Sequence, residues 1–119
     1  MSYEFEFSAG EGVPAGMYKG RFDRVESREK NEHGESVRFV WIVAEGDHKD
    51  GIATRICGVD RKPTPKNALG RILAGLAGRS VEIGEKITAD DFIGNEYLLQ
   101  VADAPGGTGT RVETVMPIP

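Results

Sequence analysis

The chain has 119 residues and a mass of 12.9 kDa, which fits one domain and leaves no room for two. Hydrophobic residues make up 39% and charged residues 29% of the sequence, which excludes a disordered acidic chain and a membrane protein. The single cysteine excludes an internal disulfide and a zinc site built from cysteines. The first residues include Glu4 and Glu6 and lack the basic and apolar regions of a signal peptide, so we expect a cytoplasmic protein that has no membrane partner.

The charge distribution leaves two interpretations open. The net charge is −4 and the isoelectric point is about 5.2, which argues against a strong nucleic-acid binder. Within residues 53–79, however, Asp60 is the only acidic residue, and the basic residues are Arg55, Arg61, Lys62, Lys66, Arg71 and Arg79. These side chains form either a basic stripe on an acidic body or an ordinary solvated surface.

Two strands are predicted before residue 45. Alternation of apolar and polar residues predicts the first over 17–26, with a bulge near Asp23 where the alternation loses phase. Residues 27–35 are polar and predict a hairpin loop. The second strand, over 36–44, is apolar on both faces, as a curved strand of a small barrel requires. Its core face is either Val37, Phe39, Trp41 and Val43, which the pattern favours, or Val40 and Ile42.

The second half of the chain predicts a third strand over 52–57, one helix, and two more strands over 97–102 and 111–116. Thr64 is the expected N-cap, Pro65 the first helical residue, and Gly78 the stop. Residues 88–94 predict one further helical turn. The resulting fold is an all-β, five-stranded Greek-key barrel of OB-fold type with one helix between strands three and four. We expect this domain over 17–119, preceded by an N-terminal arm, 1–16, that is flexible or forms an edge strand.

No pattern in the sequence indicates catalysis. His33 and His48 lie in predicted polar loops without a partner at motif spacing, and Cys57 lies on a strand, as buried structural cysteines do. Asp90 and Asp91 suit the first turn of a helix. The glycine-rich segment 106–109 lacks the lysine of a phosphate-binding loop. We therefore expect no enzyme activity, no catalytic residue, no metal and no cofactor.

A binding surface is the remaining expectation. OB-folds receive ligands on strands two and three and on the flanking loops, and single-stranded nucleic acid needs cations for phosphates and aromatic faces for bases. The candidates lie in or next to this region, or just before the helix, whose N-terminus can assist phosphate binding. The predicted nucleic-acid-binding residues are Arg28, Lys30, Arg38, Trp41, Arg55, Arg61, Lys62 and Lys66.

Several short segments resemble a family of short, mostly phage-encoded proteins of unknown function that are considered similar to OB-fold single-stranded-DNA-binding proteins. The resemblance runs from about residue 13 to 117, through the segments 14–18, 37–46, 65–76 and 92–97. It implies an OB-fold and a role beside phage replication or recombination proteins, and it supplies no catalytic residues. The end of the chain, 116–119, lacks the acidic tail of bacterial single-stranded-DNA-binding proteins.

The sequence therefore predicts an OB-fold module that binds single-stranded DNA with little sequence preference. The alternative is a protein–protein interaction or structural module that pairs through the barrel edge or the N-terminal arm, where Tyr3, Phe5 and Phe7 alternate with polar residues. A homo-oligomer or a replication or recombination protein would then be the partner. An oligosaccharide-binding barrel is a third alternative, and it would need exposed aromatic residues without a basic stripe.

Overall fold

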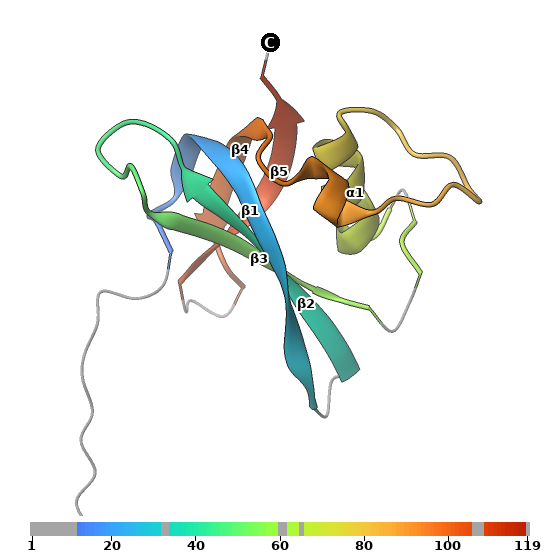
Figure 1. The fold of residues 1–119 in the computed structure, drawn as a ribbon. Coiled ribbons are helices and arrows are strands. Elements are labelled where there is room, and N and C mark those ends of the chain that lie inside the picture. The colour runs from blue at the N-terminus through green and yellow to red at the C-terminus, as the bar shows by residue number, and fades with distance from the viewer. Residues whose placement is uncertain (1–11, 32–33, 60–61, 65, 106–108, 119) are drawn as a thin grey trace, which may run out of the picture.

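The computed structural model describes residues 12–31, 34–59, 62–64, 66–105 and 109–118, apart from the side chains of residues 29–31 (Figure 1). The five strands are β1 (Gly16–Asn31), β2 (Gly34–Val43), β3 (Ile52–Gly58), β4 (Glu96–Asp103) and β5 (Thr110–Pro117). They form one sheet in the order β3-β2-β1-β4-β5, and every neighbouring pair is antiparallel. The helix α1 (Ala68–Ala77) and the short 3-10 helix η1 (Ala89–Phe92) lie between β3 and β4 in the chain. The predicted five-stranded antiparallel architecture with one main helix at this place is confirmed.

The sheet is not closed into a barrel, contrary to the sequence-based expectation of a closed one. β3 and β5 are its two edge strands, and they contact each other without forming a backbone ladder in the described residues. The backbone at Val13 and the side chain of Arg55 bridge the gap between these two strands. The backbone N–H of Val13 donates to the carbonyl of Ile52 on β3 (3.1 Å), and the Thr110 hydroxyl on β5 donates to the carbonyl of Val13 (2.6 Å). Further along, the Nη1 atom of Arg55 on β3 donates to the carbonyl of Val112 on β5 (3.2 Å).

Residue 16, the predicted end of the N-terminal arm, coincides with the start of β1. Val13 precedes that boundary, yet it is buried in the core because it occupies the gap between the edge strands. Residues 1–11, including the alternating Tyr3, Phe5 and Phe7, lie outside the described residues. The part of the predicted arm that the structure describes therefore packs against the sheet.

β1 and β2 form a hairpin that reaches past the rest of the sheet (Figure 1). Their pairing continues to Asn31 and Gly34, so the loop predicted over 27–35 is strand for most of its length. β3 ends at Gly58, opposite Ser36, so the hairpin has only two strands beyond that point in the described part of the chain. Its sequence is polar there and lacks the apolar alternation that identifies a half-buried strand. The predicted bulge at Asp23 is confirmed by the shift in register between Phe22 and Arg24.

The core lies on one face of the sheet and contains a cluster of three aromatic rings. Phe22, Phe39 and Trp41 are almost fully buried, with ring centroids 5.5 Å apart for Phe22 and Trp41 and 6.2 Å apart for Phe39 and Trp41. The favoured interpretation of β2 is therefore confirmed, because Val37, Phe39, Trp41 and Val43 face this core. Val40 points to the opposite side of the sheet and is also fully buried.

Helix α1 begins three residues later than the sequence suggests. Asn67 is its N-cap, and the side-chain oxygen of Asn67 accepts the Gly70 N–H at 2.8 Å. The Thr64 hydroxyl instead accepts the Asn67 N–H in a turn just before the helix (3.2 Å), and Pro65 lies outside the described residues. Asn is at least as good an N-cap as Thr, and here it is the residue that reaches the first free N–H groups. Gly78 ends the helix in a left-handed conformation (φ 72°), as predicted. No helix among the residues that the structure describes is long and apolar enough to cross a membrane.

Helix α1 packs on β5 with its backbone close to the strand. Ile72 and Leu76 are buried in the core, and the Tyr97 hydroxyl on β4 donates to the Leu76 carbonyl at 2.6 Å. A Cβ atom added at Gly75 would lie 2.5 Å from the Val115 carbonyl oxygen and 2.8 Å from the Val115 Cβ. Glycine at this position therefore sets how closely the helix approaches the sheet.

The first prediction concerns Gly75. In an exposed helix, replacement of Gly by Ala raises stability by about 1 kcal/mol. We expect Gly75→Ala to lower the free energy of unfolding by about 1–3 kcal/mol instead, because the new methyl group overpacks against β5. Denaturant unfolding measures the difference. The control is Gly58→Ala, whose Cβ would find its nearest neighbour at 3.9 Å and should change stability little; a stabilising Gly75→Ala would contradict the packing described here.

Candidate nucleic-acid interface

The outer sheet face, defined as the side of β1, β2 and β3 away from the aromatic core, carries arginines on one side and apolar residues on the other. The strand register arranges it in three rows that run from β1 through β2 to β3. The rows are Arg21–Ile42–Ile52, Arg24–Val40–Thr54 and Glu26–Arg38–Ile56. Beyond them, Arg28 pairs with Ser36 on the hairpin. Three of the four arginines on this face lie on β1 and Arg38 lies on β2, whereas the exposed apolar side chains lie on β3.

The apolar part of this face is exposed only toward β3. Ile52 is 38% and Ile56 46% exposed, whereas Val40 between the strands is fully buried. Exposed apolar side chains next to cations give a surface that can contact both the flat faces and the charged backbone of an extended polymer.

Two carboxylates partly neutralise the arginines. Glu26 accepts from Arg38 (2.6 Å to Nη2) and from Arg24 (3.1 Å to Nε), and Arg24 also pairs with Asp23. The hydrogen bonds from Arg38 and then Arg24 hold the pKa of Glu26 below its ordinary value, so this carboxylate stays charged at neutral pH. Arg21 and Arg28 are exposed, and neither forms an ion pair with any described residue. Four arginines therefore face these two carboxylates and Glu96 of β4, which lies directly across from Arg21, and the outer sheet face keeps a positive excess.

The predicted site residues fall into four groups. Arg28 and Arg38 lie on the outer sheet face. Lys62 and Lys66 are exposed in the segment between β3 and α1, away from the three rows. The side chain of Lys30 and the whole of Arg61 lie outside the described residues. The other two, Trp41 and Arg55, face the interior.

Trp41 cannot serve as a stacking platform, so its inclusion among the binding residues is wrong. Its side chain is fully buried (0% exposed) between Phe22 and Phe39, and its partner across β2 and β3 is the buried Ala53. The strand alternation places it on the face opposite to Arg38.

Arg55 is likewise not available to a ligand on the outer sheet face. It is 6% exposed, and its guanidinium group bonds the Val112 carbonyl and lies 3.7 Å from a Glu113 carboxylate oxygen. An arginine on a strand usually indicates a solvated face. Arg55 alternates in phase with Ala53 and Cys57, whose side chains face the core. This alternation is the sequence pattern that indicates an inward-facing Arg55.

Sequence reasoning missed Arg21 and Arg24 as members of the interface. In a regular strand, residues 21 and 24 would point to opposite faces. The bulge at Asp23 shifts the alternation by one residue and brings both arginines to the outer sheet face. The bulge was predicted, so its consequence for these two side chains could have been drawn from the sequence.

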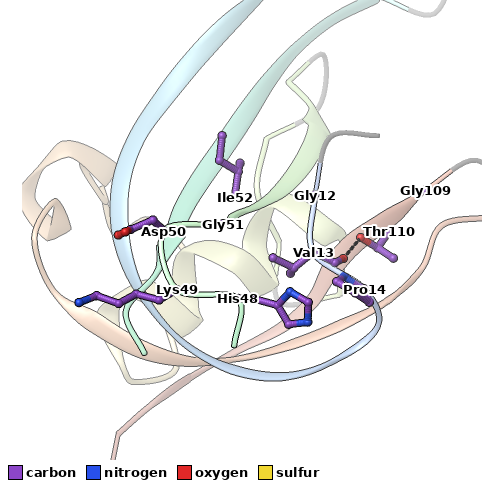
Figure 2. A pocket seen from close by; sticks show the side chains of 10 residues that line it. All are labelled: Gly12, Val13, Pro14, His48, Lys49, Asp50, Gly51, Ile52, Gly109 and Thr110. Carbon is purple, nitrogen blue, oxygen red and sulfur yellow. Dashed lines mark hydrogen bonds between the residues drawn. The ribbon is translucent and has the colours of Figure 1, made fainter. Parts of the chain in front are cut away.

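A separate cleft lies where the segment 12–14 meets the edge strands (Figure 2). It is open, has a volume of about 820 Å³, and its lining includes Val13, His48 and Thr110 together with the turn at Asp50 and Gly51. The His48 ring also contacts Tyr18 edge-on, with centroids 5.8 Å apart. Figure 2 shows Val13 held to Thr110 beside the His48 ring. The cleft thus marks the point where the chain crosses between β3 and β5.

The remaining chemically distinctive side chains stand apart from the outer sheet face. Cys57 is buried in the core, and this burial raises the pKa of its thiol. His48 is exposed, and His33 lies outside the described residues. Within the described ranges, no group of three or more His, Cys, Asp and Glu side chains is placed to hold a metal ion.

Neither a protein-family model nor a curated protein matches this chain. The functional assignment therefore depends on the geometry of the outer sheet face and on the chemistry of its side chains.

The second prediction uses Trp41, the only tryptophan in the chain. Because it is fully buried, we expect its fluorescence to show short-wavelength emission, resistance to quenching by acrylamide, and no stacking-type quenching by oligo-dT. Denatured protein provides the control for an accessible indole. Long-wavelength emission from the native protein, or direct quenching by the oligonucleotide, would contradict the placement of Trp41 in the core.

Proposed function

We propose that this chain is an OB-fold-like module that binds single-stranded DNA with little sequence preference, along the outer sheet face. The observation that carries the proposal is the arrangement of that face in rows, with arginines on β1 and β2 and exposed apolar side chains on β3. Non-specific binders of single strands combine a cationic track for the phosphates with surfaces that contact the bases.

The strand arrangement supports the OB-fold interpretation. The order β3-β2-β1-β4-β5, with β3 in contact with β5 and the helix between β3 and β4, agrees with a partly open five-stranded OB barrel. In that fold, ligands lie on strands two and three and on the adjoining loops, which corresponds here to the outer sheet face and the β1–β2 hairpin.

The composition of the surface predicts the type of affinity. Exposed isoleucines replace aromatic platforms at this face, so base contacts contribute less than the 1–3 kcal/mol typical of each stacked base. The phosphate contacts of Arg21 and Arg28 then dominate, and binding depends steeply on salt. Arg28 lies across from Ser36, which pairs with Gly58 at the end of β3, and it therefore extends the cationic track along β1.

We further propose that this binding serves phage or prophage DNA replication or recombination, in line with the family that the sequence resembles. A module of this kind protects or presents single strands without catalysing a reaction on them.

The third prediction tests the interface with fluorescence anisotropy of a labelled oligo-dT of about 30 nucleotides, at several salt concentrations. Arg21→Gln combined with Arg28→Gln should weaken binding and reduce the slope of log K against log salt by about 0.7 for each phosphate that the variant no longer neutralises. Glu26→Gln should strengthen binding, because it removes a carboxylate that competes with phosphate for Arg24 and Arg38.

The control is Lys86→Gln, an exposed cation in the loop between α1 and η1, which should leave the affinity unchanged. Absence of binding at low salt, where phosphate attraction is strongest, would overturn the proposed function. The exposed Ile52 and Ile56 would then favour the alternative of a protein–protein module, which the oligomeric state before and after deletion of residues 1–12 would examine.

A further inference from the structure

Three arginines from three different elements converge on one carboxylate at the gap between β3 and β5. Arg55 on β3, Arg71 on α1 and Arg111 on β5 surround Glu113 on β5, and we call these three residues the arginine cluster. The cluster lies on edge strands and a helix, away from the rows of the outer sheet face.

Two members of the cluster contact Glu113 through the same carboxylate oxygen. The Nε atom of Arg111 lies 2.6 Å from Oε1 of Glu113, and the Nη1 atom of Arg55 lies 3.7 Å from it. The hydrogen bond from Arg111, with the nearby charges of the cluster, lowers the pKa of Glu113, so the carboxylate is ionised at neutral pH.

Arg71 reaches the same place from the helix. Gly75 packs against Val115, and Arg71 lies one helical turn before Gly75, on the same side of α1. Glu113 lies two residues before Val115 on β5, and the charge of Arg71 acts on Glu113 and on Cys57. Arg71 therefore lies on the side of α1 that faces β5, and its guanidinium group forms no ion pair with the described part of the chain.

The cluster has more positive charge and more donors than Glu113 satisfies. In the part of the chain that the structure describes, Glu113 is the only carboxylate that pairs with these arginines, so two of the three positive charges are not compensated by an ion pair. The Nε atom of Arg55 is buried and has no hydrogen-bond partner among the described residues, although buried donors normally have one. Arg111 gives its Nε to Glu113, while its Nη groups make no hydrogen bond with the described residues. Arg71 is exposed and Arg111 is about one-third exposed, so a small anion can reach both from solvent.

From these contacts we infer an anion-binding site in the arginine cluster, which takes a phosphate group. Planar guanidinium groups bind phosphate through paired, charge-assisted hydrogen bonds, and here Arg71 and Arg111 offer free donors in addition to the buried charge of Arg55. The phosphate belongs either to a small phosphorylated molecule or to a nucleic-acid backbone. The site does not depend on the outer sheet face, so it stands or fails separately from the proposed function.

The fourth prediction tests this site with pyrophosphate titrated into the full-length protein against sodium chloride at matched ionic strength. Thermal unfolding and the NMR signals of the arginine Nε–H groups report binding. We expect a saturable rise in the unfolding temperature and shifts of the cluster's Nε–H signals with pyrophosphate. Loss of one charged hydrogen-bonding partner should make Arg71→Gln bind pyrophosphate about tenfold more weakly.

Arg71→Gln is suited to the test because the exposed side chain contributes little to packing, and Lys86→Gln is the matched control that should bind like the wild-type protein. Equal responses to pyrophosphate and to chloride, or equal affinity of the Arg71→Gln and Lys86→Gln variants for pyrophosphate, would overturn the inference.

The source of the phosphate is distinguished by a second arm with oligo-dT. If Arg71→Gln weakens oligo-dT and pyrophosphate binding together, the site holds a nucleic-acid phosphate. If the variant loses pyrophosphate and keeps its oligo-dT affinity, the site holds a small phosphorylated molecule. If the wild-type protein binds pyrophosphate and fails to bind oligo-dT, the proposed function is overturned while the anion site stands.

Discussion

The guanidinium group of Arg55 connects the two edge strands of a sheet whose other neighbours are joined by backbone ladders. Its Nη1 atom donates to the Val112 carbonyl and faces Glu113. A side-chain hydrogen bond therefore joins β3 to β5, whereas backbone hydrogen bonds join the other neighbouring strands. A buried guanidinium is costly unless it is paired and hydrogen-bonded, and Val112 and Glu113 supply these contacts to Nη1, while Nε has no partner among the described residues. Val13 makes a second crossing at the start of β3.

This closure divides the cations of the chain into two surfaces with different character. On the outer sheet face, arginines of β1 and β2 share rows with exposed isoleucines of β3, and we propose this face for an extended single strand. At the gap, Arg111 and the buried Arg55 contact Glu113 and Arg71 is exposed on α1, and we propose this cluster for a single compact anion. The net charge of the chain is negative and does not indicate these two basic surfaces, because the local electrostatic field depends on where the charges lie rather than on their sum.

Much of the fold could be predicted from the sequence, because alternation and capping residues are local signals. The order of strands and helix along the chain, the bulge at Asp23 and the end of α1 at Gly78 all follow from such signals. The open gap could not be predicted, because it depends on contacts between distant residues, such as Arg55 with Val112. The extent of the hairpin was missed because residues 27–35 are polar and carry no apolar alternation. At the site, hydrophobicity alone left the direction of Trp41 open, and only the packing with Phe22 decides it.

The most direct test of the crossing is hydrogen exchange in the wild-type protein and in Arg55→Met, with Arg38→Met as the control. Arg38 also bridges two strands, through Glu26, but these strands share a backbone ladder. If Arg55 holds the gap, Arg55→Met should speed exchange of the amides in β3 and β5 while the amides at the β1–β2 and β1–β4 ladders keep their protection. Arg38→Met should leave the protection of β3 and β5 unchanged. Unaltered exchange in β3 and β5 of Arg55→Met, or equal loss of protection over all five strands, would contradict the role of Arg55 as the connection between the edge strands.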